Sequence, residues 1–279
     1  MTHEEAFLAD ILADRADETA RRIYADWLMD SYDPVAQARG EFIHLQCDLA
    51  RCAPGDPRPA APAKRERELL LAHGREWGAP FQRLGCVCWE YRRGFVEGVG
   101  LPASALLAQG AALFRAAPID EIKLYHAGGM LGEVASSQHL ARLRVLDLEK
   151  NELGDGDLDS LAWSPHLGEL RTLLLWSNHV GDAGLRSLLG GLPRLERLDL
   201  SGNAVGDGGA ESLARSPVYG RLRLLDLSAN QIGDAGAMAL ASSEHAGSVG
   251  WIDLAKNPIG TSGQAALREK LAGRVHLAG

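Results

Sequence analysis

Aliphatic residues recur in the second half of the chain in one local pattern at nearly constant spacing. Each copy alternates apolar and other residues, as in Leu146 and Leu148, and then continues with an Asn, an aliphatic residue and usually a Gly-Asp pair. Five asparagines mark the copies: Asn151, Asn178, Asn203, Asn230 and Asn257. Their spacings are 27, 25, 27 and 27 residues. Alternation with period two predicts a short strand in each copy, with the leucines facing a core.

The residues after each predicted strand favour a turn and then a helix. The Asn can bond backbone groups where the strand has ended. We expect the Asp of the Gly-Asp pair to cap the helix that follows it, such as residues 183–189. The four aspartates are Asp155, Asp182, Asp207 and Asp234. Capping is preferred to a cation site because each Asp stands directly before a predicted helix.

Degenerate copies flank the five clear ones. Residues 119–124 have the strand pattern without the Asn, and residues 274–277 form a final predicted strand after a helix at 264–271. Such atypical ends are typical of the caps that a repeat array requires. Because one repeat cannot bury its own leucines, the array is expected to fold as a unit.

Repeats of roughly 20–29 residues with this strand and Asn resemble leucine-rich repeats, and the Gly-Asp turn before a helix resembles the ribonuclease-inhibitor-like type. The resemblance implies an α/β fold: a leucine-rich-repeat solenoid with a curved parallel sheet and convex helices. In the first third of the chain, the spacing of apolar residues predicts a small, mainly helical module. Its expected helices span residues 4–12, 18–29, 35–51, 64–73 and 104–115, with a loop at 52–62 and a hairpin of 87–91 with 95–99.

Motifs in this first third resemble the bacterial repeat-companion domain. They are Tyr-Ala-Asp-Trp-Leu at residues 24–28, Glu-Phe-Ile-His-Leu-Gln-Cys at 41–47, and a bridge-like Arg-Gly-Phe-Val-Glu at 93–97. The resemblance implies a companion module at 1–53, then a linker, helix, hairpin and N-terminal cap at 54–117, then the solenoid with its C-terminal cap at 118–279. It implies no reaction, cofactor or catalytic residue.

Charge and hydropathy narrow the range of partners. The net charge is −8 and the sequence pI is about 5.6, so a nucleic-acid partner is disfavoured. No window approaches the roughly 18 apolar residues of a membrane span, and the start has no secretory pattern. We therefore expect a cytoplasmic protein without a membrane partner, monomeric by itself.

The cysteines are the strongest candidates for chemistry. Cys47, Cys52, Cys86 and Cys88 could be imagined as a zinc site, but one pair is too tight and the other falls on a predicted helix. Buried reduced thiols are the simpler interpretation. No His or acid is recognisably paired with a Cys, so we expect no catalytic, cofactor or metal residue and no enzyme.

The strand period also predicts which side chains face away from the core. Departures from the repeated Leu-Asp-Leu-Ser pattern are the informative positions, above all Leu174 and Trp176. Exposed aromatics beside acids are typical of protein-binding surfaces. The candidate partner-binding residues are Lys123, Tyr125, Asp147, Glu149, Leu174, Trp176, Arg197, Asp199, Asp226, Trp251 and Asp253.

The sequence thus favours a non-catalytic scaffold or adaptor that binds a protein or peptide on the concave face of the repeats. Charge complementarity points to a partner with a basic segment. Two alternatives stay open: a regulatory protein that activates a small GTPase, and a zinc-stabilised adaptor.

Overall fold

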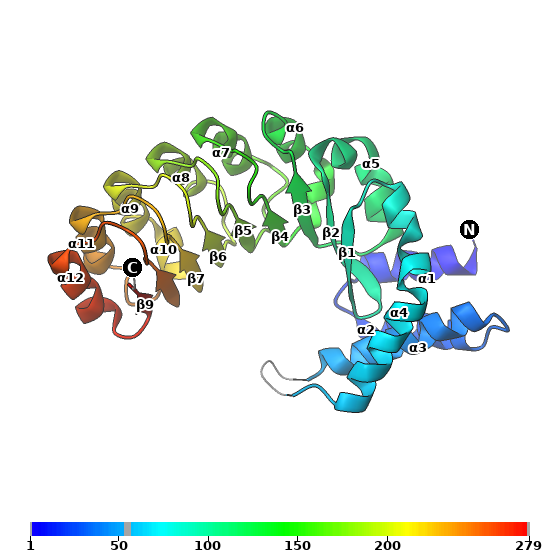
Figure 1. Cartoon of the computed structure of the whole chain (residues 1–279). Coiled ribbons are helices and arrows are strands. Elements are labelled where there is room, and N and C mark those ends of the chain that lie inside the picture. The colour runs from blue at the N-terminus through cyan, green and yellow to red at the C-terminus, as the bar shows by residue number, and fades with distance from the viewer. Residues whose placement is uncertain (1, 53–56, 278–279) are drawn as a thin grey trace. The chain divides into compact units, whose positions relative to one another are not determined.

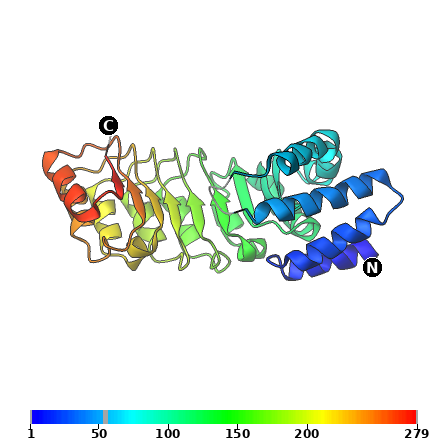
Figure 2. The same ribbon diagram turned by 90° about the horizontal axis from the view of Figure 1, so that it is seen from below.

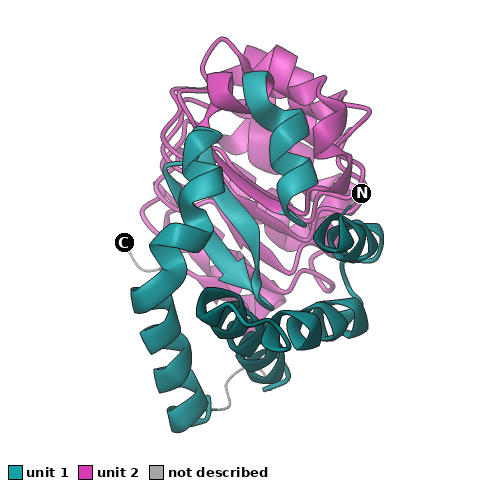
Figure 3. Ribbon diagram, turned by 90° about the vertical axis from the view of Figure 1, so that its right-hand side faces the viewer, with its two compact units in different colours: residues 1–101, 108–120 teal, residues 102–107, 121–279 magenta. Residues whose placement is uncertain are grey.

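A computed structural model of the chain describes residues 2–52 and 57–277. These residues form twelve α-helices, one 3-10 helix and nine strands, so the fold is mixed α/β. The chain divides into two compact units, coloured separately in Figure 3: unit 1 comprises residues 1–101 and 108–120, and unit 2 comprises residues 102–107 and 121–279. Residues 53–56 of the predicted linker lie outside the described residues. No helix among the described residues is long and apolar enough to cross a membrane.

Unit 1 consists of helices and one β-hairpin. Its elements are α1 (His3–Ala13), α2 (Glu18–Met29), α3 (Pro34–Ala50), α4 (Ala60–Arg83), β1 (Cys88–Arg92) and β2 (Phe95–Pro102). They are followed by α5 (Ala103–Ala116), of which residues 103–107 belong to unit 2. The first three helices begin at side-chain caps: Thr2, Asp17 and Asp33 each accept a hydrogen bond from a backbone N–H of the first turn. The predicted helices at 4–12, 18–29, 35–51 and 104–115 and the predicted hairpin are confirmed.

Helix α4 is longer than the sequence indicated. The predicted helix at 64–73 is confirmed as part of α4, but its bounds and the predicted loop to residue 62 are wrong, because α4 begins at Ala60 and continues to Arg83. Gly78 and Pro80 disfavour a helix locally, yet tertiary packing maintains it. A Cβ at Gly78 would lie 2.1 Å from the Trp89 Cζ2 atom, so only glycine lets the indole pack against the helix.

The hairpin docks on the helices through a buried ion pair and an apolar contact. Arg21 Nη2 lies 2.7 Å from Glu97 Oε1, and both side chains are almost fully buried. Arg93 Nη2 donates to the same carboxylate at 2.9 Å. Phe95 joins the core of unit 1, which includes Ile11, Tyr24, Ala25, Leu28, Ile43 and Cys47. Segments far apart in sequence thus share one small core.

Unit 2 is a parallel sheet with helices along one side of it (Figure 1). Its strands are β3 (Glu121–Tyr125), β4 (Val145–Asp147), β5 (Thr172–Leu174), β6 (Arg197–Asp199), β7 (Leu224–Asp226), β8 (Trp251–Asp253) and β9 (Val275–His276). Each pairs with the next in sequence order (Figure 2). The helices are α6 (Leu131–Ala135), α7 (Asp155–Ala162), α8 (Asp182–Leu188), α9 (Asp207–Ala214), α10 (Pro217–Arg221), α11 (Asp234–Ser242) and α12 (Thr261–Leu271), with a 3-10 helix at Gln138–Arg142. Both degenerate terminal strands of the prediction are confirmed.

The repeated asparagines join one copy to the next. Asn178 Oδ1 accepts from the backbone N–H groups of Asn151 and Leu153, both at 3.0 Å. Its Nδ2 donates to the carbonyls of Leu148 and Leu175 at 3.0 and 2.9 Å. The predicted role of the Asn in satisfying the bend is confirmed.

Repeated aspartates accept hydrogen bonds from the backbone of the following repeat rather than from their own helix. The prediction that each Asp caps its own helix is wrong, because the Gly before it is the N-cap residue and the Asp is the first helical residue. Asp182 Oδ1 accepts from Gly206 N at 2.7 Å, and Asp207 Oδ1 accepts from Gly233 N at 2.7 Å and Gly236 N at 2.8 Å. Stacking in register places each carboxylate beside the helix N-terminus of the following repeat, where orphan N–H groups need an acceptor.

Candidate functional site

The side of the unit 2 sheet that faces away from its helices carries three columns of side chains, which we call the outward face. Leu146, Leu173, Leu198, Leu225 and Ile252 are fully buried on the other side. The paired strands align the first column as Glu121, Val145, Thr172, Arg197, Leu224 and Trp251. The second column is Lys123, Asp147, Leu174, Asp199, Asp226 and Asp253. The predicted alternation of inward and outward positions is confirmed.

A third column follows from backbone bonds just beyond the strands. Lys150 N donates to Trp176 O at 2.9 Å, and Ser177 N donates to Ser201 O at 2.9 Å. These bonds continue the register, so Glu149, Trp176 and Ser201 occupy equivalent places in adjacent repeats. The structure therefore places all eleven predicted site residues on the outward face, either in the aligned strands or directly after them.

At the N-terminal end of the outward face, one cation pairs with two carboxylates. Lys123 Nζ lies 3.2 Å from Asp147 Oδ2 and also bonds Glu149 Oε1. The same ammonium lies 5.8 Å from the centroid of the Tyr125 ring. Burial opposes the charge of Lys123, but hydrogen bonds to the two carboxylates outweigh it and raise its pKa. Burial raises the pKa of Asp147, although backbone and Lys123 contacts counteract it. Asp147 and Glu149 thus already have a cationic partner.

Trp176 is the central aromatic residue of this surface. Its side chain is 37% exposed, and Lys150 Nζ lies 4.3 Å from its ring centroid. A cation over an indole face is an attractive contact that a competing cation from a partner could replace. Trp251 is 43% exposed in the first column at the far end. The two indoles mark the apolar part of the surface.

Three aspartates in consecutive strands form the acidic part of the outward face. Asp199, Asp226 and Asp253 each accept from the backbone N–H two residues later at 2.9 Å, which fixes the orientation of each carboxylate. Adjacent strands lie roughly 4.8 Å apart, so these charges repel one another. Burial, with contributions from Asp199 and Asp253, raises the pKa of Asp226. Within the described residues, neither Asp199 nor Asp226 has a cationic partner.

Sequence reasoning missed the group that ends this column. Asp253 pairs in register with His276, whose Nδ1 lies 2.9 Å from Asp253 Oδ2. The predicted strand at 274–277 was the available signal, since extending the column by one strand reaches this His. The result is a row of three carboxylates with a His at one end.

The cysteines do not gather into a site. No disulfide joins the four cysteines, and no group of three His, Cys, Asp or Glu residues that could hold a metal occurs in the described part of the chain. Burial raises the pKa of Cys47, and burial raises the pKa of Cys86 to about 11. Protonated buried thiols are weak nucleophiles and weak metal ligands.

The family comparison agrees with the repeat geometry. A model described as Leucine Rich repeat matches residues 139–162, 192–214 and 222–241, all within unit 2. These matches support leucine-rich repeats in unit 2. A search of curated proteins found no match.

Proposed function

We propose that this protein is a non-catalytic scaffold or adaptor that binds a protein or peptide partner on the outward face of its leucine-rich repeats. The row formed by Asp199, Asp226 and Asp253 carries the proposal. These carboxylates are held by the backbone, and the first two are not neutralised by a cation of the described chain. Solenoids commonly use such extended surfaces for binding.

The charge of the row selects the chemistry of the partner. A Lys or Arg side chain would relieve the repulsion among the three carboxylates and contribute charge-assisted hydrogen bonds. An apolar group of the partner would lie on Trp176 or Trp251, since partly exposed indoles are frequent centres of binding energy. The partner is therefore a basic protein segment with an apolar residue close by, bound in the cytoplasm by a monomer of this chain.

A matched pair of tryptophan variants tests the proposal. Trp176→Ala removes the central indole of the outward face, whereas Trp163→Ala removes an indole that is 79% exposed after α7. Capture experiments from the native cell should recover the partner with wild type and Trp163→Ala, and lose it with Trp176→Ala. Equal recovery by both variants, each folded by circular dichroism, would remove Trp176 from the site. Faster GTP hydrolysis by a captured GTPase would favour a regulatory function instead.

A further inference from the structure

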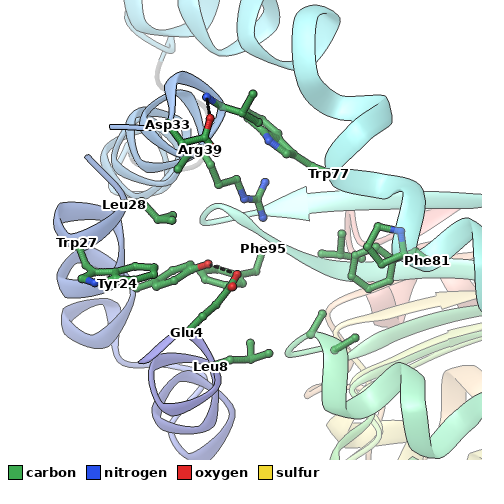
Figure 4. A pocket seen from close by; sticks show the side chains of 16 residues that line it. Glu4, Leu8, Tyr24, Trp27, Leu28, Asp33, Arg39, Trp77, Phe81 and Phe95 are labelled. Atoms are coloured by element: carbon green, nitrogen blue, oxygen red, sulfur yellow. Dashed lines mark hydrogen bonds between the residues drawn. The ribbon is translucent and has the colours of Figure 1, made fainter. Parts of the chain in front are cut away.

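Unit 1 contains a cavity that the proposed binding function of the repeats does not use. Its volume is about 430 Å³, and α1, α2, α3, α4 and β2 contribute to its walls. Tyr24, Trp27, Leu28 and Phe81 give it an apolar and largely aromatic lining (Figure 4). Pockets for small organic ligands usually measure roughly 300–1,000 Å³ and combine such walls with a few polar groups.

Arg39 provides a positive charge at this cavity. In Figure 4 its guanidinium points into the space between Trp77 and Phe95. The guanidinium carbon lies 4.9 Å from the Trp77 ring centroid, 5.1 Å from that of Tyr91 and 5.8 Å from that of Phe95. These rings hold the guanidinium in place by cation–π contacts, which leave its N–H donors available for an acceptor.

A donor of Arg39 has no acceptor. Its Nη1 is buried and makes no hydrogen bond within the described residues. Burial lowers the pKa of Arg39, and the charge interactions with the phenols of Tyr91 and Tyr24 counteract this only in part. Arg21 in the same unit has a counter-charge, because Glu97 lies 2.7 Å from its guanidinium, although its Nε also makes no hydrogen bond among the described residues. A buried donor without a partner is rare and costly in a folded protein.

The two acids at this cavity already have other partners. Glu4 Oε1 accepts from the Tyr24 hydroxyl at 2.9 Å, and Asp33 Oδ1 accepts from Val35 N at 3.0 Å as the cap of α3. Neither forms an ion pair with Arg39 among the described residues. Their charges oppose the binding of any anion, and of a dianion more than of a monoanion, so the site fits at most a single negative charge on an apolar body.

We propose that the cavity of unit 1 binds a small aromatic carboxylate, with the carboxylate accepting from the partly buried guanidinium of Arg39 and the ring lying among Tyr24, Trp27 and Leu28. The site is separate from the outward face of the repeats, and its ligand is a small molecule rather than a protein. A charge-assisted bond inside an apolar pocket would provide both affinity and discrimination against neutral analogues.

A matched pair of probes tests the charge requirement on the full chain. Isothermal titration calorimetry with 2-naphthoate and with its neutral analogue 2-naphthamide compares the same ring with and without the anion. We expect 2-naphthoate to bind at least about tenfold more tightly. Equal affinity for the two probes, or binding of neither, would overturn the proposal and leave Arg39 as a structural residue of the core.

A matched pair of variants locates the site. Arg39→Met should reduce the affinity for 2-naphthoate to that for 2-naphthamide, whereas Arg67→Met, which removes an exposed charge from α4, should change it less than about twofold. Undiminished 2-naphthoate binding by Arg39→Met would contradict the assignment. If Arg39→Met does not fold, a crystal of the wild type soaked in 2-naphthoate decides: a carboxylate within hydrogen-bond distance of the Arg39 guanidinium supports the site, and its absence there rejects it.

Discussion

The two units of this chain stabilise their polar groups in opposite ways. In unit 2 the same bonds recur from repeat to repeat, so Asn178, Asn203 and Asn230 each fill an equivalent place in the ladder. In unit 1 the buried ion pair occurs once and joins distant segments, Arg21 of α2 and Glu97 of β2. From this difference we expect that the loss of one periodic contact lowers the stability less, because equivalent contacts remain in the neighbouring copies. The loss of the single buried ion pair should lower it more, because no equivalent pair remains.

The largest expected effect comes from breaking the unique pair of unit 1. Glu97→Gln leaves the fully buried Arg21 without its counter-charge, which should lower the free energy of unfolding by about 3–5 kcal/mol. The control is Glu196→Gln in unit 2, because Glu196 and its partners Arg171 and Arg223 are much more exposed. An exposed pair contributes less than about 1 kcal/mol. Urea denaturation followed by circular dichroism measures both; a smaller loss for Glu97→Gln than for Glu196→Gln would refute the comparison.

The next effect concerns the asparagine ladder. Asn178→Ala removes the acceptor for two backbone N–H groups and the donor to two carbonyls, and should cost about 2–3 kcal/mol. The neighbouring His179 has an exposed side chain, so His179→Ala should change stability by less than about 0.5 kcal/mol. Denaturant midpoints of the two variants provide the test, and similar midpoints would contradict a structural role for the ladder.

A smaller change in the free energy of unfolding is expected from substitutions of the residue before each Asn. This residue has a positive φ in every clear copy: Lys150, Ser177, Gly202, Ala229 and Lys256, with values of 54°, 56°, 64°, 53° and 56°. Only the third copy has the glycine that this conformation favours. Ala229→Gly should therefore stabilise unit 2 and Gly202→Ala should destabilise it, each by about 1 kcal/mol. Thermal unfolding checks both signs; shifts in the same direction would show that other contacts decide.

The smallest expected effect is a pH-dependent one on the outward face. Burial and the neighbouring carboxylates raise the pKa of Asp226, so its ionised form costs stability in the folded state. That cost is fully present above the folded pKa and vanishes as the pH falls below the unfolded pKa. Asp226→Asn should thus be more stable than wild type at pH 7, with the gain shrinking on acidification. A less stable variant at pH 7 would show that the ionised carboxylate supports the fold.

The sequence predicted most of unit 2 because the period of a strand determines both burial and register. Once Leu146 and Leu148 are assigned to the core, the outward position of Asp147 follows in every copy. The role of Asp182 did not follow, since the choice between its own helix and the next one depends on how the repeats stack. The curvature of the solenoid and the companion-domain resemblance of residues 1–53 stay predictions.

In unit 1, the contacts between segments distant in sequence could not be predicted from the sequence. Its helices could be predicted from apolar spacing, but the continuation of α4 past Gly78 depends on Trp89, which is distant in sequence. Arg39 gave no signal at all, because the rings around it come from α3, α4 and the hairpin. A site formed by unique tertiary contacts has no period from which it could be inferred.

The central claim is that the outward face binds a basic partner, and a charge-matched comparison tests it most directly. One variant carries Asp199→Asn, Asp226→Asn and Asp253→Asn; the other carries Glu211→Gln, Glu244→Gln and Glu269→Gln, which removes three acids whose side chains are 42%, 86% and 71% exposed. Calorimetric affinity for the captured partner should fall at least about tenfold in the first variant and less than about twofold in the second. Equal losses in both would show that net charge alone attracts the partner, and no loss in the first would contradict the account.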